Sequence, residues 1–209
     1  MTCREAFGRF ALIGALVLAP VLASCAGGPA GTELGPTEGQ MIGHFGRFSE
    51  IQSSLVMGDL PAAQAAAQSL SGRDFPPTRG AWGDALKSAA HDVVRATDIE
   101  TAAQASGVVV QTCGSCHAEV GVTPNVRFAP GAPRGDSRAE HMARDMWAVD
   151  QLMDGMVGND NEFWMNGAGA LADDEHMADM AAQVMAAEGE QRAIVYGRVI
   201  AACADCHTR

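Results

Sequence analysis

The sequence predicts an all-α protein organised as two tandem four-helix bundles. Of the 209 residues, 47% are apolar, which is enough for a buried core, but only 5% are aromatic and one is tyrosine. Alanine, methionine and charged residues dominate instead, and these favour helices over sheets. Apolar residues recur at helical spacing in several segments, and the two halves of the chain align with one another. We therefore expect a duplicated helical domain.

The charge balance excludes nucleic acid as a partner. The chain has 14 Lys and Arg against 25 Asp and Glu, a formal net charge of -11. Phosphate backbones are bound by clustered cations, which this composition does not supply. An acidic chain is attracted instead to a basic patch on a partner protein.

Residues 1–24 are predicted to be a lipoprotein signal peptide. Arg4 and Arg9 precede an apolar run over 10–22. This run has the length of the apolar region of a signal peptide and is short for a membrane span. The segment 22–25, of sequence LASC, resembles the lipobox of bacterial lipoproteins. This resemblance implies cleavage before Cys25 and a lipid on its thiol. The alternative is an ordinary secretory peptide that is cleaved near the same point.

Residues 25–39 are expected to form a flexible tether, because the segment after Cys25 is rich in Gly, Pro and Thr. A lipid on Cys25 would hold the chain at the periplasmic side of a bacterial membrane. Ala26 does not resemble the acidic retention signal of some inner-membrane lipoproteins, which favours the outer membrane.

The first bundle is expected over residues 40–120. Phe48, Ile51 and Leu55 lie at helical spacing in its first helix. Pro61 is tolerated in the first turn of the second helix, and Asp98 is a suitable N-cap for the fourth. The four predicted helices span residues 38–57, 59–70, 80–97 and 98–119.

A proline-containing segment, 121–135, is expected to link this bundle to a second one over 136–209. The first helix of the second bundle carries an apolar stripe at steps of four and three, formed by Met142, Met146, Val149, Met153 and Met156. The other three helices are predicted at 159–171, 173–187 and 189–207. Acidic residues at 173–175 are expected at a helix N-terminus, where the helix dipole favours them.

Both bundles end in the same motif, because segments 113–117 and 203–207 both read Cys-x-x-Cys-His. This is the attachment pattern of c-type haem. Thiols at positions i and i+3 share one face of a helical turn and can add to two vinyl groups on one porphyrin edge, while the histidine at i+4 reaches the iron. The motifs predict two covalent haems. The porphyrins would be bonded by Cys113, Cys116, Cys203 and Cys206, and the proximal iron ligands would be His117 and His207.

Two other interpretations of the motifs stay open. A thioredoxin-like redox pair belongs at a helix N-terminus in a βαβ setting, whereas both motifs here end apolar helical stretches. A zinc site would need cysteines from both motifs to meet, and it leaves the repeated histidine unexplained. Cys3 leaves with the signal peptide and Cys25 carries the lipid, so no cysteine remains for a disulfide.

A helical bundle whose last helix ends in CxxCH near the C-terminus resembles the cytochrome c prime family. The resemblance covers residues 40–119 and 136–209, and only Thr208 and Arg209 follow the second motif. It implies one haem in each bundle. The tandem arrangement departs from the family, whose members are usually single-haem chains.

In proteins similar to cytochrome c prime, the first helix covers the distal face of the haem. The resemblance therefore points to His44 and His141, which align at an offset of 97 residues, as candidate distal iron ligands. Coordination by Met41 or Met142 and an open distal position are the alternatives.

Arg47 and Arg144 each follow one of these histidines by three residues. They either pair with haem propionates or buried carboxylates, or lie on a solvated helix face.

Together these features predict an exported, membrane-anchored dihaem cytochrome that carries electrons between redox partner proteins. We expect no enzyme activity, because no nucleophile–base pair or substrate motif occurs. One alternative is binding of NO or CO at an open distal site. Another is a dihaem peroxidase or reductase, for which Asp145, aligned with Phe48 of the first half, would make the second site polar.

Overall fold

Helices fill most of the chain that the structure describes. The computed structural model describes residues 36–75, 79–124 and 131–208, and within these ranges every helix or strand element is an α-helix. The all-α prediction is confirmed for this part of the chain. The predicted signal peptide, Cys25 and the tether up to residue 35 lie outside the described residues. None of the described helices is long and apolar enough to cross a membrane.

The first half contains α1 (Pro36–Val56), α2 (Leu60–Ser71), α3 (Gly80–Arg95) and α4 (Ile99–Val120). The carboxylate of Asp59 caps α2 by accepting a hydrogen bond from the Ala62 N–H at 3.0 Å. Asp98 caps α4 in the same way through the Thr101 N–H at 2.7 Å, as predicted. Each cap satisfies a backbone donor that the helix itself leaves unpaired. Gly121, with a φ of 68°, ends α4.

The second half contains α5 (Arg138–Val157), α6 (Asn161–Ala172), α7 (Ala178–Ala186) and α8 (Gln191–His207). Ser137 and Glu140 form a capping box at the start of α5, in which each side chain bonds the other residue's backbone N–H. Asp160 caps α6 through the backbone N–H groups of Glu162 and Phe163.

Most helix boundaries lie within two residues of the prediction, and two differences affect how a segment is interpreted. α7 begins at Ala178, so the helix N-terminus predicted at residues 173–175 is wrong. Asp173 instead follows the last turn of α6, and Asp174 accepts the backbone N–H of His176 at 2.7 Å, so these acidic residues form a turn. α1 begins at Pro36, inside the segment predicted as tether, because proline is compatible with the first turn of a helix.

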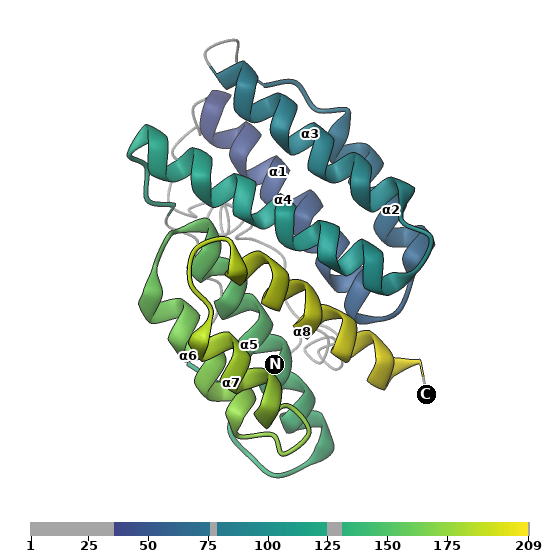
Figure 1. The fold of residues 1–209 in the computed structure, drawn as a ribbon, viewed down its shortest axis with the longest axis vertical. Coiled ribbons are helices and arrows are strands. Elements are labelled where there is room, and N and C mark those ends of the chain that lie inside the picture. Colours follow the sequence, from purple (N-terminus) through teal and green to yellow (C-terminus); the bar gives the residue numbers. More distant parts are fainter. Residues whose placement is uncertain (1–35, 76–78, 125–130, 209) are drawn as a thin grey trace, which may run out of the picture. The chain divides into compact units, whose positions relative to one another are not determined.

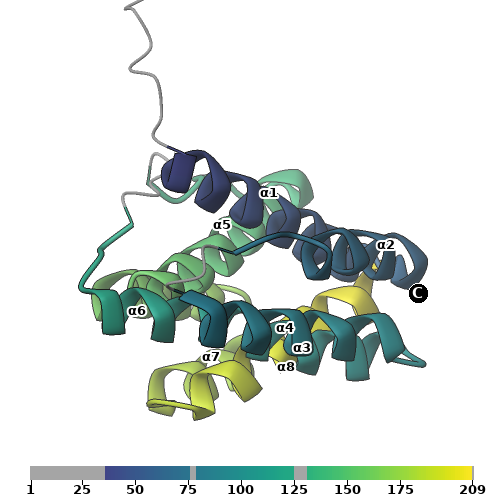
Figure 2. The same ribbon diagram turned by 90° about the horizontal axis from the view of Figure 1, so that it is seen from above.

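Consecutive helices pack against each other in both halves, and the last helix of each half returns to the first: α4 contacts α1, and α8 contacts α5. The halves meet chiefly along α4 and α8, which run antiparallel (Figures 1 and 2). The CxxCH motif lies in the C-terminal turns of each helix. The two motifs therefore lie at opposite ends of this helix pair (Figure 1).

Glycines at equivalent positions of the repeat allow α4 and α8 to approach closely. A Cβ on Gly107 would lie 2.1 Å from the carbonyl oxygen of Ala193, and one on Gly197 would lie 2.8 Å from that of Ala103. Both the two glycines and the two alanines are separated by the same 90 residues that separate the motifs. The contact is reciprocal, as in a two-fold symmetric dimer.

One cluster of buried apolar side chains runs through both halves, and it includes the fully buried Leu55 of α1 and Leu152 of α5. Hydrogen bonds among three polar side chains also join the halves. Gln52 of α1 donates a hydrogen bond to Asp150 of α5 at 2.8 Å, and its carbonyl accepts one from the Tyr196 hydroxyl of α8. The helices of both halves therefore pack together in one compact unit.

Candidate functional site

The two thiols of the first motif lie side by side near the end of α4. Burial, and then the neighbouring Cys116, raises the pKa of Cys113 to about 12. Burial also raises the pKa of Cys116, which Arg79 lowers and Glu119 raises. Neither cysteine is in a disulfide. Two thiols on one face of a helical turn are what attachment to a single porphyrin edge requires.

The imidazole of His117 is held by the other half of the chain. Its Nδ1 lies 2.9 Å from the carbonyl oxygen of Val157, at the end of α5. Because a carbonyl only accepts, Nδ1 carries the proton and donates it. In the neutral ring Nε2 then has a free lone pair, which is the form of histidine that binds a metal.

The second motif repeats the paired thiols at the end of α8. Burial raises the pKa of Cys203 to about 12, with further contributions from Asp145 and then Cys206. Cys206 is exposed and His207 is half-buried. Asp145 on α5 therefore lies near this thiol, and α5 contacts α8 in the same half.

A pocket of about 290 Å³ opens beside the first motif. Its lining includes Trp82 and Ala85 of α3, Arg79 directly before α3, and Glu119 of α4. Arg79 and Glu119 also act on the pKa of Cys116, so two of the lining residues lie near that thiol. Its size is near the lower end for cavities that bind organic ligands.

The two candidate distal histidines differ in their surroundings. His44 is buried on α1, and its ring packs against Phe75 with centroids 4.5 Å apart. Burial, and then the positive charge of Arg73, lowers the pKa of His44, so its ring is neutral at pH 7. His141 is half-buried on α5. Neither histidine directly contacts the proximal histidine of its half among the described residues.

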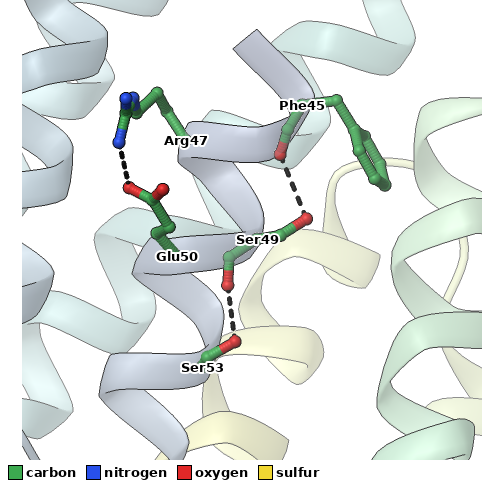
Figure 3. Close-up of polar contacts among 5 residues, drawn as sticks. All are labelled: Phe45, Arg47, Ser49, Glu50 and Ser53. Atoms are coloured by element: carbon green, nitrogen blue, oxygen red, sulfur yellow. Dashed lines mark hydrogen bonds and ion pairs between the residues drawn. The ribbon is translucent and has the colours of Figure 1, made fainter. Parts of the chain in front are cut away.

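The two aligned arginines also differ. Figure 3 shows Arg47 paired with Glu50, one turn further along α1, at 2.5 Å. Glu50 is exposed and Arg47 is partly exposed, so this ion pair lies on a helix face that reaches solvent. Arg144 differs because its Nε is buried without a hydrogen-bond partner.

Four polar atoms of α5 are buried without partners among the described residues, and three of them lie within one helical turn: Arg144 Nε, Asp145 Oδ1 and Trp147 Nε1. Of these three residues, Asp145 acts on the pKa of the Cys203 thiol in the second motif. Burial, followed by the charge of Asp174, raises the pKa of Asp145. Buried polar atoms are normally paired, and orphans point to a missing ligand or ion. The two N–H donors, Arg144 Nε and Trp147 Nε1, would suit a group that carries carboxylates, as haem does.

The residues present therefore fit a haem at each motif. Paired thiols and a histidine are in place at both motifs, the tautomer of His117 is fixed, and α5, whose Asp145 acts on Cys203, carries two buried N–H donors without partners. The zinc interpretation required thiols from both motifs to meet, but the motifs lie at opposite ends of the α4–α8 pair. Within residues 36–75, 79–124 and 131–208, no three His, Cys, Asp or Glu side chains form a metal site by themselves.

Comparisons with protein-family models, with curated proteins and with solved structures find no match. The assignment of function therefore depends on the residues of this chain.

The sequence did not predict the residues of the second half that contact the first motif. Val157 and Asn159 lie beyond the apolar stripe of α5, and neither belongs to a motif. Asn159 has a φ of 52°, and its amide donates a hydrogen bond to the Gly114 carbonyl at 2.7 Å. The one signal in the sequence was the Gly-Asn pair at 158–159, which favours a turn.

Proposed function

We propose that the chain is an exported dihaem c-type cytochrome that carries electrons between redox partner proteins. In this proposal it consists of two tandem bundles, each resembling cytochrome c prime, with one haem at each CxxCH motif. A lipid on Cys25 anchors it to the periplasmic side of a bacterial membrane, with the outer membrane favoured. The acidic chain, with a net charge of -11, favours partners that present a basic patch.

The observation that carries this proposal is the repeated arrangement of the motifs. Cys113 and Cys116 at the end of α4, and Cys203 and Cys206 at the end of α8, place paired thiols at opposite ends of one antiparallel helix pair. A bound haem supplies a one-electron couple at its iron.

The chain's own residues would hold the haems in three ways. The thiols bond the porphyrins, and His117 and His207 provide proximal nitrogens. His44, kept neutral by burial, and His141 are proposed as the distal nitrogens. Histidine on both sides gives a lower reduction potential than methionine, because methionine ligation raises it.

A pyridine haemochrome assay on the purified chain tests the attachment. We expect two covalent haems per chain in the wild type and one in each of the full-length variants Cys113→Ala/Cys116→Ala and Cys203→Ala/Cys206→Ala. The matched control is Cys25→Ala, which keeps both haems and releases the chain from membranes. A wild-type chain without covalent haem would refute the proposal.

Optical spectra of the ferric and ferrous protein, with and without CO, test the distal ligands. We expect two low-spin haems that CO leaves unchanged. His44→Ala and His141→Ala should each convert one haem to a high-spin, CO-binding form. A wild type that already binds CO would favour the gas-binding alternative, and peroxide turnover by one CO-binding haem would favour the peroxidase.

A further inference from the structure

The end of α5 is docked on the first motif by three contacts. We call residues 156–159 the α5 turn. Within it, the Val157 carbonyl accepts a hydrogen bond from His117 Nδ1 at 2.9 Å, and the Asn159 amide donates to the Gly114 carbonyl at 2.7 Å. The third contact is steric: a Cβ on Gly114 would lie 2.1 Å from the Met156 carbonyl oxygen, so only glycine permits this approach.

Local backbone geometry sets the position of these groups. The carbonyls at a helix C-terminus have no partner inside the helix, so the Val157 oxygen is free to accept from outside. Asn159 has a φ of 52°, in the left-handed region, which asparagine tolerates better than most residues. This conformation ends α5 and turns the chain, and it allows the asparagine amide to hydrogen-bond the Gly114 carbonyl of α4.

Among residues 36–75, 79–124 and 131–208, the second motif has no equivalent pair of hydrogen bonds from the other half. The end of α1 does reach it, since a Cβ on Gly58 would lie 2.4 Å from Thr208 Cγ2. The Ala204 carbonyl, which is the repeat equivalent of the Gly114 carbonyl, accepts from Thr208 of its own helix end. In the part of the chain that the structure describes, the imidazole of His207 has no hydrogen-bond partner. The repeat is symmetric in sequence but not in these contacts.

We propose that the α5 turn positions the proximal histidine of the first haem, that Asn159 anchors it, and that the two haems are thereby made unequal. This inference depends on the proposed function. A hydrogen bond from Nδ1–H to a carbonyl increases the basicity of Nε2, and a more basic ligand stabilises the ferric iron. The first haem therefore has a lower potential than it would have with a free histidine.

Potentiometric titration of the full-length dihaem protein tests the role of Asn159. The variant is Asn159→Gly, because glycine keeps the positive φ and removes only the amide. We expect one of the two reduction waves to move upward. The oxidised-to-reduced ratio of that haem at a fixed potential should change about tenfold, which is about 59 mV for a one-electron couple. The matched control is Thr208→Val, which removes the hydrogen bond from the Thr208 hydroxyl to the Ala204 carbonyl at the second motif. It should leave the wave that Asn159→Gly moves at its wild-type potential.

Assignment of the wave uses the same substitution in the single-haem chains. Asn159→Gly should shift the potential in the Cys203→Ala/Cys206→Ala background and leave it unchanged in the Cys113→Ala/Cys116→Ala background. Far-UV circular dichroism and a thermal melt of each variant control for folding. If a single-haem chain does not fold, His44→Ala in the dihaem protein identifies the reduction wave of the first haem, because it removes the proposed distal ligand of that haem. Asn159→Gly should move the same wave.

The outcomes separate the two proposals. Absence of covalent haem in the wild type would refute the cytochrome assignment itself. Two covalent haems with neither wave moved by Asn159→Gly, or with both moved equally, would leave that assignment intact and overturn the role of the α5 turn.

Discussion

Two carboxyl groups one turn apart on α5 lie at the boundary between the halves. Asp150 accepts the hydrogen bond from Gln52, and Asp154 is only 7% exposed, with one oxygen that has no partner. Burial, and then the negative charge of Asp150, raises the pKa of Asp154 to about 7. The Tyr196 hydroxyl of α8, whose own pKa is raised well above its usual value by burial, also faces these groups. Asp154 therefore holds a proton in the folded chain at mildly acid pH.

We predict that Asp154→Asn removes a loss of stability that the wild type undergoes as pH rises from acid to neutral. Between the usual aspartate pKa and about 7, the folded chain keeps the Asp154 proton that the unfolded chain releases, so wild-type stability falls as pH rises through this window. From pH 5 to pH 8, the variant should gain about 2–4 kcal/mol relative to the wild type. Urea unfolding at the two pH values measures this difference. Parallel stability profiles would show that Asp154 is not protonated in the folded chain.

At the scale of secondary-structure elements, the α4–α8 contact depends on residues without a side chain. We predict that Gly107→Ala destabilises the protein by about 1–3 kcal/mol, because the new methyl group would overlap the Ala193 carbonyl at 2.1 Å and force the helices apart. Thermal and urea unfolding of the purified variant measure the loss.

Gly169→Ala is the matched control for this substitution. Gly169 lies within α6 and is exposed, and a Cβ there would meet no atom within 4 Å. Alanine should therefore stabilise the chain by about 0.5–1 kcal/mol, since it favours the helix more than glycine does. If both substitutions had the same sign, the close approach of α4 and α8 would not determine the effect.

The helices themselves could largely be predicted, because their signals are local. Apolar spacing located α1 and α5, and Asp98 was correctly expected as the N-cap of α4. The start of α7 could not be placed, because acidic residues suit both a helix N-terminus and a turn. At 173–175 the turn prevails, with the Asp174 side chain bonding the backbone two residues on.

At the scale of the whole molecule, the continuous core joins the halves into one cooperative structure. We predict a single unfolding transition, because separating the halves would expose apolar side chains of α4 and α8 and break the Gln52–Asp150 and Gln52–Tyr196 hydrogen bonds. Coincident melting curves by near-UV and far-UV circular dichroism check this. Two resolved transitions would instead show that each half has an independent core.

The candidate sites could be predicted only up to the boundary of each half. The motifs identified Cys113, His117 and their repeat equivalents, since the ligand spacing is local. The contacts of His117 with Val157 and of Asn159 with Gly114 join residues 40 and 45 positions apart. Periodicity says which face of a helix is apolar but not which neighbour covers it, so these partners had no signature in the sequence.

The reciprocal pairing of Gly107 with Ala193 and of Gly197 with Ala103 has a consequence for how the chain can evolve. In a homodimer built on such a contact, one codon specifies both sides, and every substitution enters the interface twice. With the two copies joined in one gene, each side can acquire changes alone. A residue such as Asn159 can then be selected for its effect on one copy, and two units that began as duplicates can acquire separate tasks.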